Sequence, residues 1–87
     1  MIETIYIPTY KRANDQITLN GLPKNICEKM VTLVVQKKEY SQYQQYEDRV
    51  DRIMLVGDDI GIAKTRELIC KDAKNNKFYM IDDDIIF

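Results

Sequence analysis

The stretch that decides the fold is Lys77-Phe78-Tyr79-Met80-Ile81-Asp82-Asp83-Asp84-Ile85-Ile86-Phe87. An apolar run from Phe78 to Ile81 meets three successive aspartates, and a second apolar run follows at once. The aromatic and β-branched content of the first run is typical of a buried strand. Three unpaired carboxylates cannot lie in a dry core, so we expect the strand to leave the core at Asp82.

The three aspartates are candidates for a metal site. Successive side chains of an extended chain point to opposite faces, so Asp82 and Asp84 are expected on one face and Asp83 on the other. Two carboxylates at a strand end can hold one hard divalent cation, Mn2+ or Mg2+, with a phosphate completing its coordination. The alternative is a polar turn after the strand, since aspartate is also common in turns. The apolar run that follows immediately favours the metal site.

Composition sets limits on the size of the protein and on its partners. Eighty-seven residues form one small domain, or part of a larger one, with a thin core. The formal net charge is -1 and the sequence contains no histidine. This charge argues against DNA binding through a broad basic surface, although it leaves room for a local basic patch. Without histidine, any catalysis must use carboxylates, lysine, tyrosine or a metal.

The sequence also predicts a compartment. No stretch is apolar for long enough to span a bilayer and no signal peptide is visible, so we expect a cytoplasmic protein without a membrane partner. Cys27 and Cys70 lie far apart and lack metal-ligand spacing. We expect both to be reduced, half-buried small hydrophobic residues.

Strand-like and helix-like segments alternate along the chain. The strands are expected at residues 2–7, 31–35, 52–56 and 77–81. The helices are expected at residues 24–30, 37–51 and 62–73, whereas 16–21 could be an extended piece or a helix start. This alternation predicts an α/β fold with a small, mainly parallel sheet of about four strands and helices on both faces.

Three tyrosines, Tyr40, Tyr43 and Tyr46, occupy every third position of the charged segment 37–51. That spacing places them along one side of a helix. Such a stripe could stack on nucleic acid, but it more often packs against a sheet with its hydroxyls at the water boundary. We therefore expect the stripe to pack.

A polar loop follows the first strand. Pro8 is expected to end that strand, because proline has no N–H to donate to a ladder. The end of a first strand is also where open α/β sheets bind ligands. Lys11 and Arg12 could therefore bind phosphates, and Tyr10 could stack on a base. The alternative is a solvated loop.

The last helix carries an unusual arginine. Asp58 or Asp59, in the turn before it, could cap the helix. Arg66 lies in the second turn, where the helix dipole disfavours a cation, so it needs an anionic partner. The candidates are the carboxylates at the strand ends or a bound phosphate, and the alternative is a pair with Asp58, Asp59 or Glu67. The apolar stripe is expected to consist of Ile62, Ala63, Ile69, Cys70 and Ala73.

Three segments, Ile5–Arg12, Gly61–Arg66 and Tyr79–Asp84, together resemble the N-terminal, nucleotide-sugar-binding half of GT-A-type glycosyltransferases. The chain looks closest to phage glycosyltransferases associated with hydroxymethylpyrimidine DNA modification. In such enzymes the first strand ends in a Pro-Ser/Thr loop that meets the nucleotide. A Gly-x-x-x-x-Arg helix start follows, and an Asp-x-Asp motif closes this half. The resemblance implies a truncated GT-A, Rossmann-like fold.

The resemblance also implies roles for individual residues. Pro8, Thr9 and Arg12 would line the base and ribose, Gly61 would allow close approach of the ligand, and Arg66 would lie near the diphosphate. Asp82 would approach the ribose or the metal, and Asp84 would hold Mn2+ or Mg2+ against the diphosphate. The metal would help the nucleoside diphosphate to leave by neutralising its charge. The full set expected to bind the donor is Pro8, Thr9, Tyr10, Lys11, Arg12, Gly61, Arg66 and Asp82.

The sequence departs from the family in length. The family continues past its Asp-x-Asp motif, whereas this sequence stops three residues after Asp84. Residues 85–87 would lack partners in a monomer, and an exposed apolar edge invites association. We therefore expect residues 1–87 to form a single domain that is a half or fragment of a larger GT-A-like domain and needs a second polypeptide. The alternatives are a homodimer that covers the exposed edge with its own copy, and a degenerate glycosyltransferase reused as a small binding protein.

Two functions follow from these observations. The first is a nucleotide-sugar-binding module of a metal-dependent glycosyltransferase, encoded by a phage and acting in the host cytoplasm, with modified DNA bases as the acceptor that the resemblance implies. The second is a small phage protein that keeps the fold but binds another protein, for example to inhibit a host enzyme or defence complex. The carboxylates and tyrosines would then form a docking surface instead of a metal site.

Overall fold

The computed structural model describes residues 3–74 and 76–85. The expectations for Ile2, Ile86 and Phe87 lie outside the described residues. The elements are β1 (Glu3–Thr9), α1 (Ile17–Gly21), α2 (Lys24–Met30), β2 (Val31–Gln36), η1 (Lys37–Glu39), α3 (Tyr40–Tyr43), η2 (Gln44–Arg49), β3 (Arg52–Val56), α4 (Gly61–Ala73) and β4 (Lys77–Met80). In this part of the chain no helix has the length and apolar character needed to cross a membrane.

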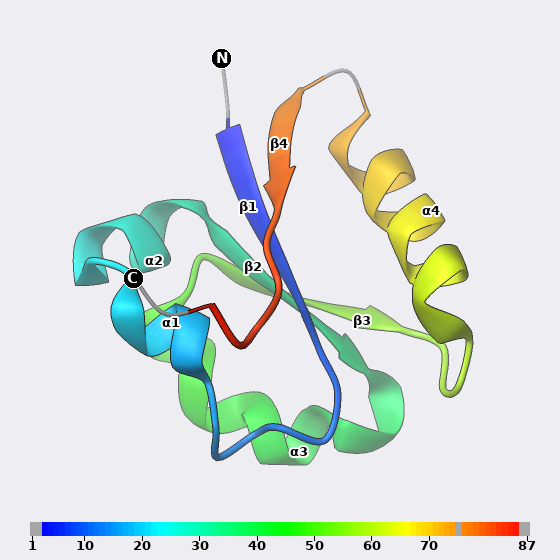
Figure 1. Cartoon of the computed structure of the whole chain (residues 1–87), viewed down its shortest axis with the longest axis horizontal. Helices are drawn as coiled ribbons and strands as arrows, with labels where there is room; N and C mark the ends of the chain where they lie inside the picture. Colours follow the sequence, from blue (N-terminus) through cyan, green and yellow to red (C-terminus); the bar gives the residue numbers. More distant parts are fainter. Residues whose placement is uncertain (1–2, 75, 86–87) are drawn as a thin grey trace.

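The strands form one sheet in the order β3-β2-β1-β4, and every pair is parallel (Figure 1). The expected small parallel α/β sheet is therefore confirmed. The chain steps outward from β1 through β2 to β3, and then returns across the sheet to place β4 on the other side of β1. The strand order thus reverses between β1 and β4, which is the point where open α/β sheets bind ligands.

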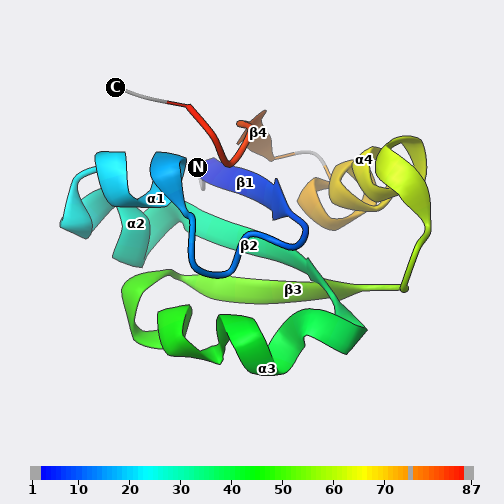
Figure 2. The ribbon, with the colours of Figure 1, turned by 60° about the horizontal axis from the view of Figure 1, so that its bottom comes forward.

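Helices cover both faces of the sheet, as Figures 1 and 2 show. On one face, Leu19 of α1, Cys27 of α2 and Tyr43 of α3 belong to a core with the inward side chains of the strands. On the other face α4 packs alone, through Ile69 and Ala73. The chain moves across the sheet in one direction from β1 to β3 and in the opposite direction from β3 to β4. A right-handed connection therefore brings α4 to the face opposite the earlier helices.

The central strands are buried on both sides. In β2, Leu33 belongs to the core under α1, α2 and α3, while its neighbour Val34 belongs to the core under α4. Both side chains are almost fully buried, at 0% and 2% exposure. Burial of one such side chain stabilises the fold by about 1.5–3 kcal/mol. Because successive side chains of β2 are buried on opposite faces, this strand anchors both helical layers to the sheet.

The tyrosine stripe packs, as expected, but not on one continuous helix. The segment expected as a helix over 37–51 forms two 3-10 turns, η1 and η2, with a single α-turn between them. Tyr43 and Tyr46 are buried. Tyr40 is half-exposed and donates its hydroxyl proton to Glu47. A 3-10 helix has three residues per turn, which keeps side chains at every third position aligned over longer distances than an α-helix does.

The expectation that Pro8 ends the first strand is wrong. β1 continues through Pro8, in register with Val34, to Thr9. The Tyr6 carbonyl accepts a hydrogen bond from the Ile81 N–H, so the backbone groups of Pro8, two residues on, also face the β4 side. β4 ends at Met80, opposite Tyr6, and not at Ile81 as expected. Pro8 therefore lacks an N–H group only on a side where no neighbouring strand would accept it, as proline does on an edge strand.

The apolar stripe expected on α4 is correct only near the end of the helix. Ile69 and Ala73 are buried, but Ile62, Ala63 and Cys70 are exposed. Ile62, in the first turn of α4, lies instead at the cavity described below, together with Val34 and Val56 of the sheet. Cys70 is not half-buried, whereas Cys27 is buried and burial raises the pKa of its thiol.

The aspartates before α4 do not cap it. No side chain caps this helix at its first residue. Asp58 Oδ1 instead accepts a hydrogen bond from the Lys38 N–H at 2.9 Å. The Asp59 carboxylate binds Lys38 Nζ at 2.8 Å. The two carboxylates thus tie the β3–α4 turn to the segment that follows β2.

Candidate functional site

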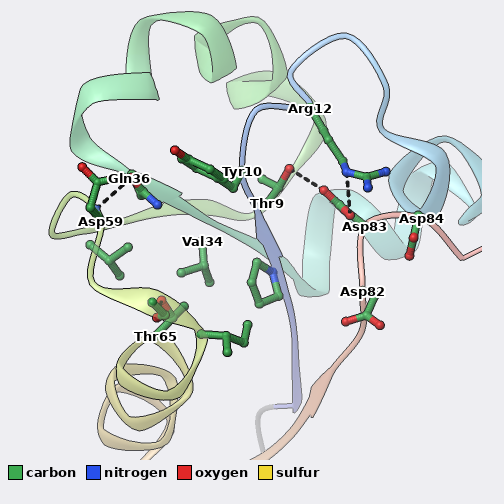
Figure 3. A pocket seen from close by; sticks show the side chains of 14 residues that line it. Thr9, Tyr10, Arg12, Val34, Gln36, Asp59, Thr65, Asp82, Asp83 and Asp84 are labelled. Carbon is green, nitrogen blue, oxygen red and sulfur yellow. Dashed lines mark hydrogen bonds and ion pairs between the residues drawn. The ribbon is translucent and has the colours of Figure 1, made fainter.

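A cavity of about 550 Å³ opens at the carboxyl ends of the strands, beside the first turn of α4 (Figure 3). Its volume lies within the range of about 300–1,000 Å³ that is usual for small-molecule sites. Its floor is apolar and comes from four different elements: Pro8 of β1, Val34 of β2, Val56 of β3 and Ile62 of α4. On this face α4 packs on the sheet through Ile69 and Ala73, whereas its first turn lines the cavity.

The aspartate triplet forms one wall of the cavity, and its three members differ. Asp83 is buried, with 9% of its surface exposed, whereas Asp82 and Asp84 are exposed. Thr9 Oγ1 donates a hydrogen bond to Asp83 Oδ2 at 2.8 Å, and Arg12 Nε lies 3.8 Å from Asp83 Oδ1. Figure 3 shows Asp83 turned toward Arg12, with Asp82 and Asp84 away from this pair.

Thr9 lies at the centre of a buried polar network. Gln16 Nε2 donates to Thr9 Oγ1 at 2.8 Å, and the hydroxyls of Thr9 and Tyr43 are 3.0 Å apart. Thr9 has one proton and gives it to Asp83, so Tyr43 must donate to Thr9. The Arg12 N–H in turn donates to the Tyr43 hydroxyl at 3.1 Å. Burial raises the pKa of Tyr43, which keeps its hydroxyl protonated as this chain of bonds requires.

Three residues near the cavity have left-handed backbone conformations. Lys11 has φ 56, Asp59 has φ 55 and Gly61 has φ 84. Such conformations cost a non-glycine residue about 1–2 kcal/mol and tend to collect at functional sites. The Lys11 N–H is held by both carboxylate oxygens of buried Glu39, at 3.0 and 3.2 Å. A Cβ on Gly61 would meet no protein atom within 4 Å, so within the chain it is the positive φ that favours glycine there.

An aromatic and amide corner completes the cavity. Tyr10 and Gln36 line the same corner (Figure 3), and Tyr10 keeps 40% of its surface exposed. Gln36 Oε1 accepts a hydrogen bond from the Asp59 N–H at 3.1 Å, which fixes the orientation of its amide. The ammonium groups of Lys11 and Lys38 lie 5.1 and 5.8 Å from the centre of the Tyr10 ring. The Tyr10 ring thus lies at the cavity, partly exposed and close to two cations.

The structure brings most of the expected site residues together. Those that line the cavity are Pro8, Thr9, Tyr10, Arg12, Gly61, Asp82 and Asp84. Lys11 and Arg66 are not among the lining residues. Arg66 is exposed and makes no ion pair within the described ranges. The partners expected for it are engaged elsewhere, because Asp58 and Asp59 bind Lys38, and Glu67 pairs with lysines on α4.

Four residues of this network were not expected from the sequence. Asp83 was assigned to the opposite face, and Tyr43 to packing alone. Gln16 acts on the nearby strand-end loop, but its type and position alone carry no sequence signal. Glu39, shortly after the central strand, could have been noted from its position, because the ends of parallel strands meet at one edge of a sheet.

The carboxylates of the cavity fit a divalent cation only in part. Over residues 3–74 and 76–85, no three His, Cys, Asp or Glu side chains gather closely enough to hold a metal by themselves. Asp82 and Asp84 both line the cavity and are exposed. Mg2+ commonly takes one or two carboxylates and completes its shell with water and substrate phosphates, so this pair suits a cation that arrives with a phosphorylated ligand.

Comparison with known proteins identifies the family. No curated protein and no solved structure matches the chain. A family model described as TET-Associated Glycosyltransferase matches residues 3–87, which is nearly the whole sequence. It includes the strand-end loop, the start of α4 and the aspartate triplet that together surround the cavity. The chain therefore belongs to the TET-associated glycosyltransferase family.

Proposed function

We propose that this chain is the nucleotide-sugar-binding half of a metal-dependent, GT-A-type glycosyltransferase. One observation carries the proposal: the loop after β1 and the aspartate turn after β4 line one cavity where the strand order reverses. Open α/β sheets bind nucleotides at this point. The family match supports a glycosyltransferase-related chemistry for the same cavity.

The base of the donor would lie at the aromatic corner. Tyr10 offers a ring for stacking, an interaction worth about 1–3 kcal/mol per base. The apolar floor formed by Pro8 and Val34 would cover the other surface of the base. Gln36, oriented by the Asp59 N–H, would present its amide hydrogens to an acceptor on the edge of the base.

The diphosphate would lie between Arg12 and the exposed aspartates. Arg12 can donate two parallel hydrogen bonds to phosphate oxygens, and its side chain retains 44% exposure. Asp82 and Asp84 would hold Mn2+ or Mg2+ against the diphosphate. When bound, the metal would neutralise charge on the departing nucleoside diphosphate. The apolar floor would exclude water from the same region.

The acceptor would be bound by residues outside this cavity. By resemblance we propose a modified base of DNA as acceptor and a phage as source, with the reaction taking place in the host cytoplasm. The net charge of -1 gives no support for direct DNA binding by this chain. A second polypeptide, or the remainder of a larger domain, would then contact the DNA and supply any catalytic base.

Calorimetric titration of UDP and UDP-glucose, first with Mn2+ and then with EDTA, tests the proposal. We expect binding that depends on the metal and that weakens by about tenfold or more in Asp84→Ala. Asp48→Ala, which removes an exposed aspartate of η2, is the matched control and should bind as the wild type does. Absence of nucleotide binding by the wild-type protein under both conditions would refute the proposal.

A second candidate function is protein binding through the β4 edge of the sheet. β4 is the terminal strand of the described sheet, and Tyr79, Met80 and Ile85 are 52%, 36% and 38% exposed. Large exposed apolar residues along an edge strand favour association with a second copy or another protein. A homodimer would appear in light scattering and dissociate in Tyr79→Lys. A strictly monomeric wild-type protein at working concentration would exclude the homodimer.

A further inference from the structure

We propose that Asp83, the middle aspartate of the triplet, positions the site by fastening the loop after β1 to the turn after β4, and does not bind the metal. The inference rests on the proposed donor site. It assigns to Asp83 a role different from that of Asp82 and Asp84, although all three are aspartates of the same motif.

The contacts of Asp83 are directed inward. One carboxylate oxygen accepts the Thr9 hydroxyl at 2.8 Å, and the other faces Arg12 Nε at 3.8 Å. The residue is 9% exposed, so little of the carboxylate remains for a cation with a hydration shell. Asp82 and Asp84 are exposed on the same turn and can meet such a cation.

The bonds that reach Asp83 continue into the loop. The Arg12 N–H donates to Tyr43, Tyr43 donates to Thr9, and Thr9 donates to Asp83. The carboxylate is therefore the final acceptor of a chain whose first donor is the backbone of the loop. Removal of a buried final acceptor leaves a hydroxyl without a partner, which is costly and permits the chain to rearrange.

The turn that carries Asp83 is also fixed from its other side. The Thr18 N–H donates to the Asp83 carbonyl at 3.1 Å, and the Ile85 N–H donates to Thr18 Oγ1 at 2.8 Å. Thr18 Oγ1 itself donates to the Asp82 carbonyl. Since the turn is held by α1 and the loop by Asp83, the distance between Arg12 and the metal carboxylates depends on Asp83.

The first test needs no ligand and measures amide hydrogen exchange at Lys11 and Arg12 by NMR. We expect Asp83→Ala to accelerate exchange by about tenfold, because the loop loses its tie to the turn. Asp83→Asn should restore most of the protection, since its amide oxygen still accepts from Thr9. Asp84→Ala should leave both amides unchanged. Equal effects of Asp83→Ala and Asp84→Ala, or no effect of either, would overturn the proposal.

A second pair of variants serves if Asp83→Ala does not fold. Tyr43→Phe breaks the same chain of bonds one link away, and Tyr40→Phe removes an exposed hydroxyl from the same turn. Only Tyr43→Phe should accelerate exchange at Arg12 beyond the change in global stability. Protection at Arg12 that is the same in both variants would contradict the proposed chain.

The last test compares UDP affinity with Mn2+ and with EDTA. In Asp83→Asn we expect the ratio of the two affinities to be preserved, because Asp82 and Asp84 still hold the metal and the asparagine still holds the loop. In Asp84→Asn the ratio itself should fall toward one. A collapsed ratio in Asp83→Asn would identify Asp83 as a metal ligand. If the wild type binds no UDP, the proposed function fails, and the exchange measurements still decide whether Asp83 fastens the loop.

Discussion

Arg12 and Arg66 both follow sequence motifs that suggest a diphosphate partner, but their surroundings differ. Arg12 lines the cavity beside Asp83, whereas Arg66 is exposed on α4 and does not line it. We expect Arg12→Ala to weaken UDP binding by about tenfold, the usual value of a charge-assisted hydrogen bond. Arg66→Ala should change affinity by less than about twofold, as is typical of a distant exposed charge. Calorimetry on the two variants measures both effects.

The pair is matched, because both variants remove one guanidinium and alter net charge equally. A uniform loss of affinity in the two would indicate that only the overall charge of the protein matters. A larger loss in Arg66→Ala would show that the side chain moves to the diphosphate on binding, as the family resemblance implies. Measurement at two salt concentrations separates these outcomes, since long-range attraction is screened by salt.

Tyr6 makes stability dependent on alkaline pH. Its hydroxyl donates to Asp72 Oδ2 at 2.7 Å, and burial together with this bond raises its pKa to about 12. In the unfolded chain a tyrosine has a pKa of about 10. Between about pH 10 and 12 the folded protein therefore retains a proton that the unfolded chain has lost, so stability falls as pH rises. The contribution is complete below pH 10, and its loss is on the order of 2 kcal/mol.

Urea unfolding at pH 9, 10 and 11 tests this dependence. Tyr6→Phe removes the titrating group and should flatten the decline in unfolding free energy over that range. Tyr79→Phe is the control, because Tyr79 is 52% exposed and should leave the decline unchanged. An equally steep decline in Tyr6→Phe would mean that other groups cause the alkaline loss.

At the scale of single elements, the end of α4 stores backbone strain. Its C-terminal cap, Lys74, has φ 55 and ψ -120, a region that is accessible almost exclusively to glycine. We expect Lys74→Gly to raise the free energy of unfolding by about 1 kcal/mol, because relief of this strain exceeds the added entropy of the unfolded chain. Lys71→Gly, inside the last turn, should lower it by about the same amount. In chemical denaturation, the changes in unfolding free energy of the two variants should have opposite signs if the cap conformation causes the strain. The same sign in both would contradict this cause.

The four strands and the helices α2 and α4 could be predicted from the sequence because local patterns determine them, whereas the segment 37–51 forms 3-10 turns around one α-turn. Val31–Val35 could only be a central strand, since it is apolar on both faces. Element boundaries depended on neighbours that the pattern does not contain. β1 passes through Pro8 because β4 stops beside Tyr6, and the apolar start of α4 stays exposed because it lines the cavity and does not pack in the core. Both wrong predictions, for the end of β1 and for the start of α4, depend on which residues of other elements lie beside these positions, and that is set by the fold.

At the scale of the whole molecule, the same distinction separates the predicted part of the site from the rest. The loop after β1 and the aspartates could be located because both follow strand ends, and parallel strands end at one edge. The contacts that organise them join positions far apart in sequence. Asp83 bonds to Thr9, Thr18 holds the aspartate turn, and Glu39 holds Lys11. No spacing rule connects such pairs. Strand alternation sets Asp83 apart from Asp82 and Asp84, but only the folded chain shows that Asp83 is the one that faces inward.

The unequal cover of the two faces leads to a prediction for the intact protein. One face carries three helical segments, while α4 alone covers the other and leaves the cavity open. A ligand in that cavity adds stability by mass action, about 2.7 kcal/mol at a concentration of 100 times its Kd. For a domain of 87 residues this corresponds to a rise in Tm on the order of 10 °C.

The gain in stability on UDP binding can also be predicted for two variants. If Arg12→Ala weakens UDP binding tenfold, the same UDP concentration with Mn2+ should stabilise it by only about half as much. Lys74→Gly, far along α4 from its first turn, should start from a higher Tm and gain about the same free energy as the wild type, because distant independent effects add. Scanning calorimetry with and without UDP and Mn2+ measures all three proteins. A gain in Arg12→Ala equal to that of the wild type would place the bound nucleotide outside the cavity, since occupancy of the cavity must depend on the cation that lines it.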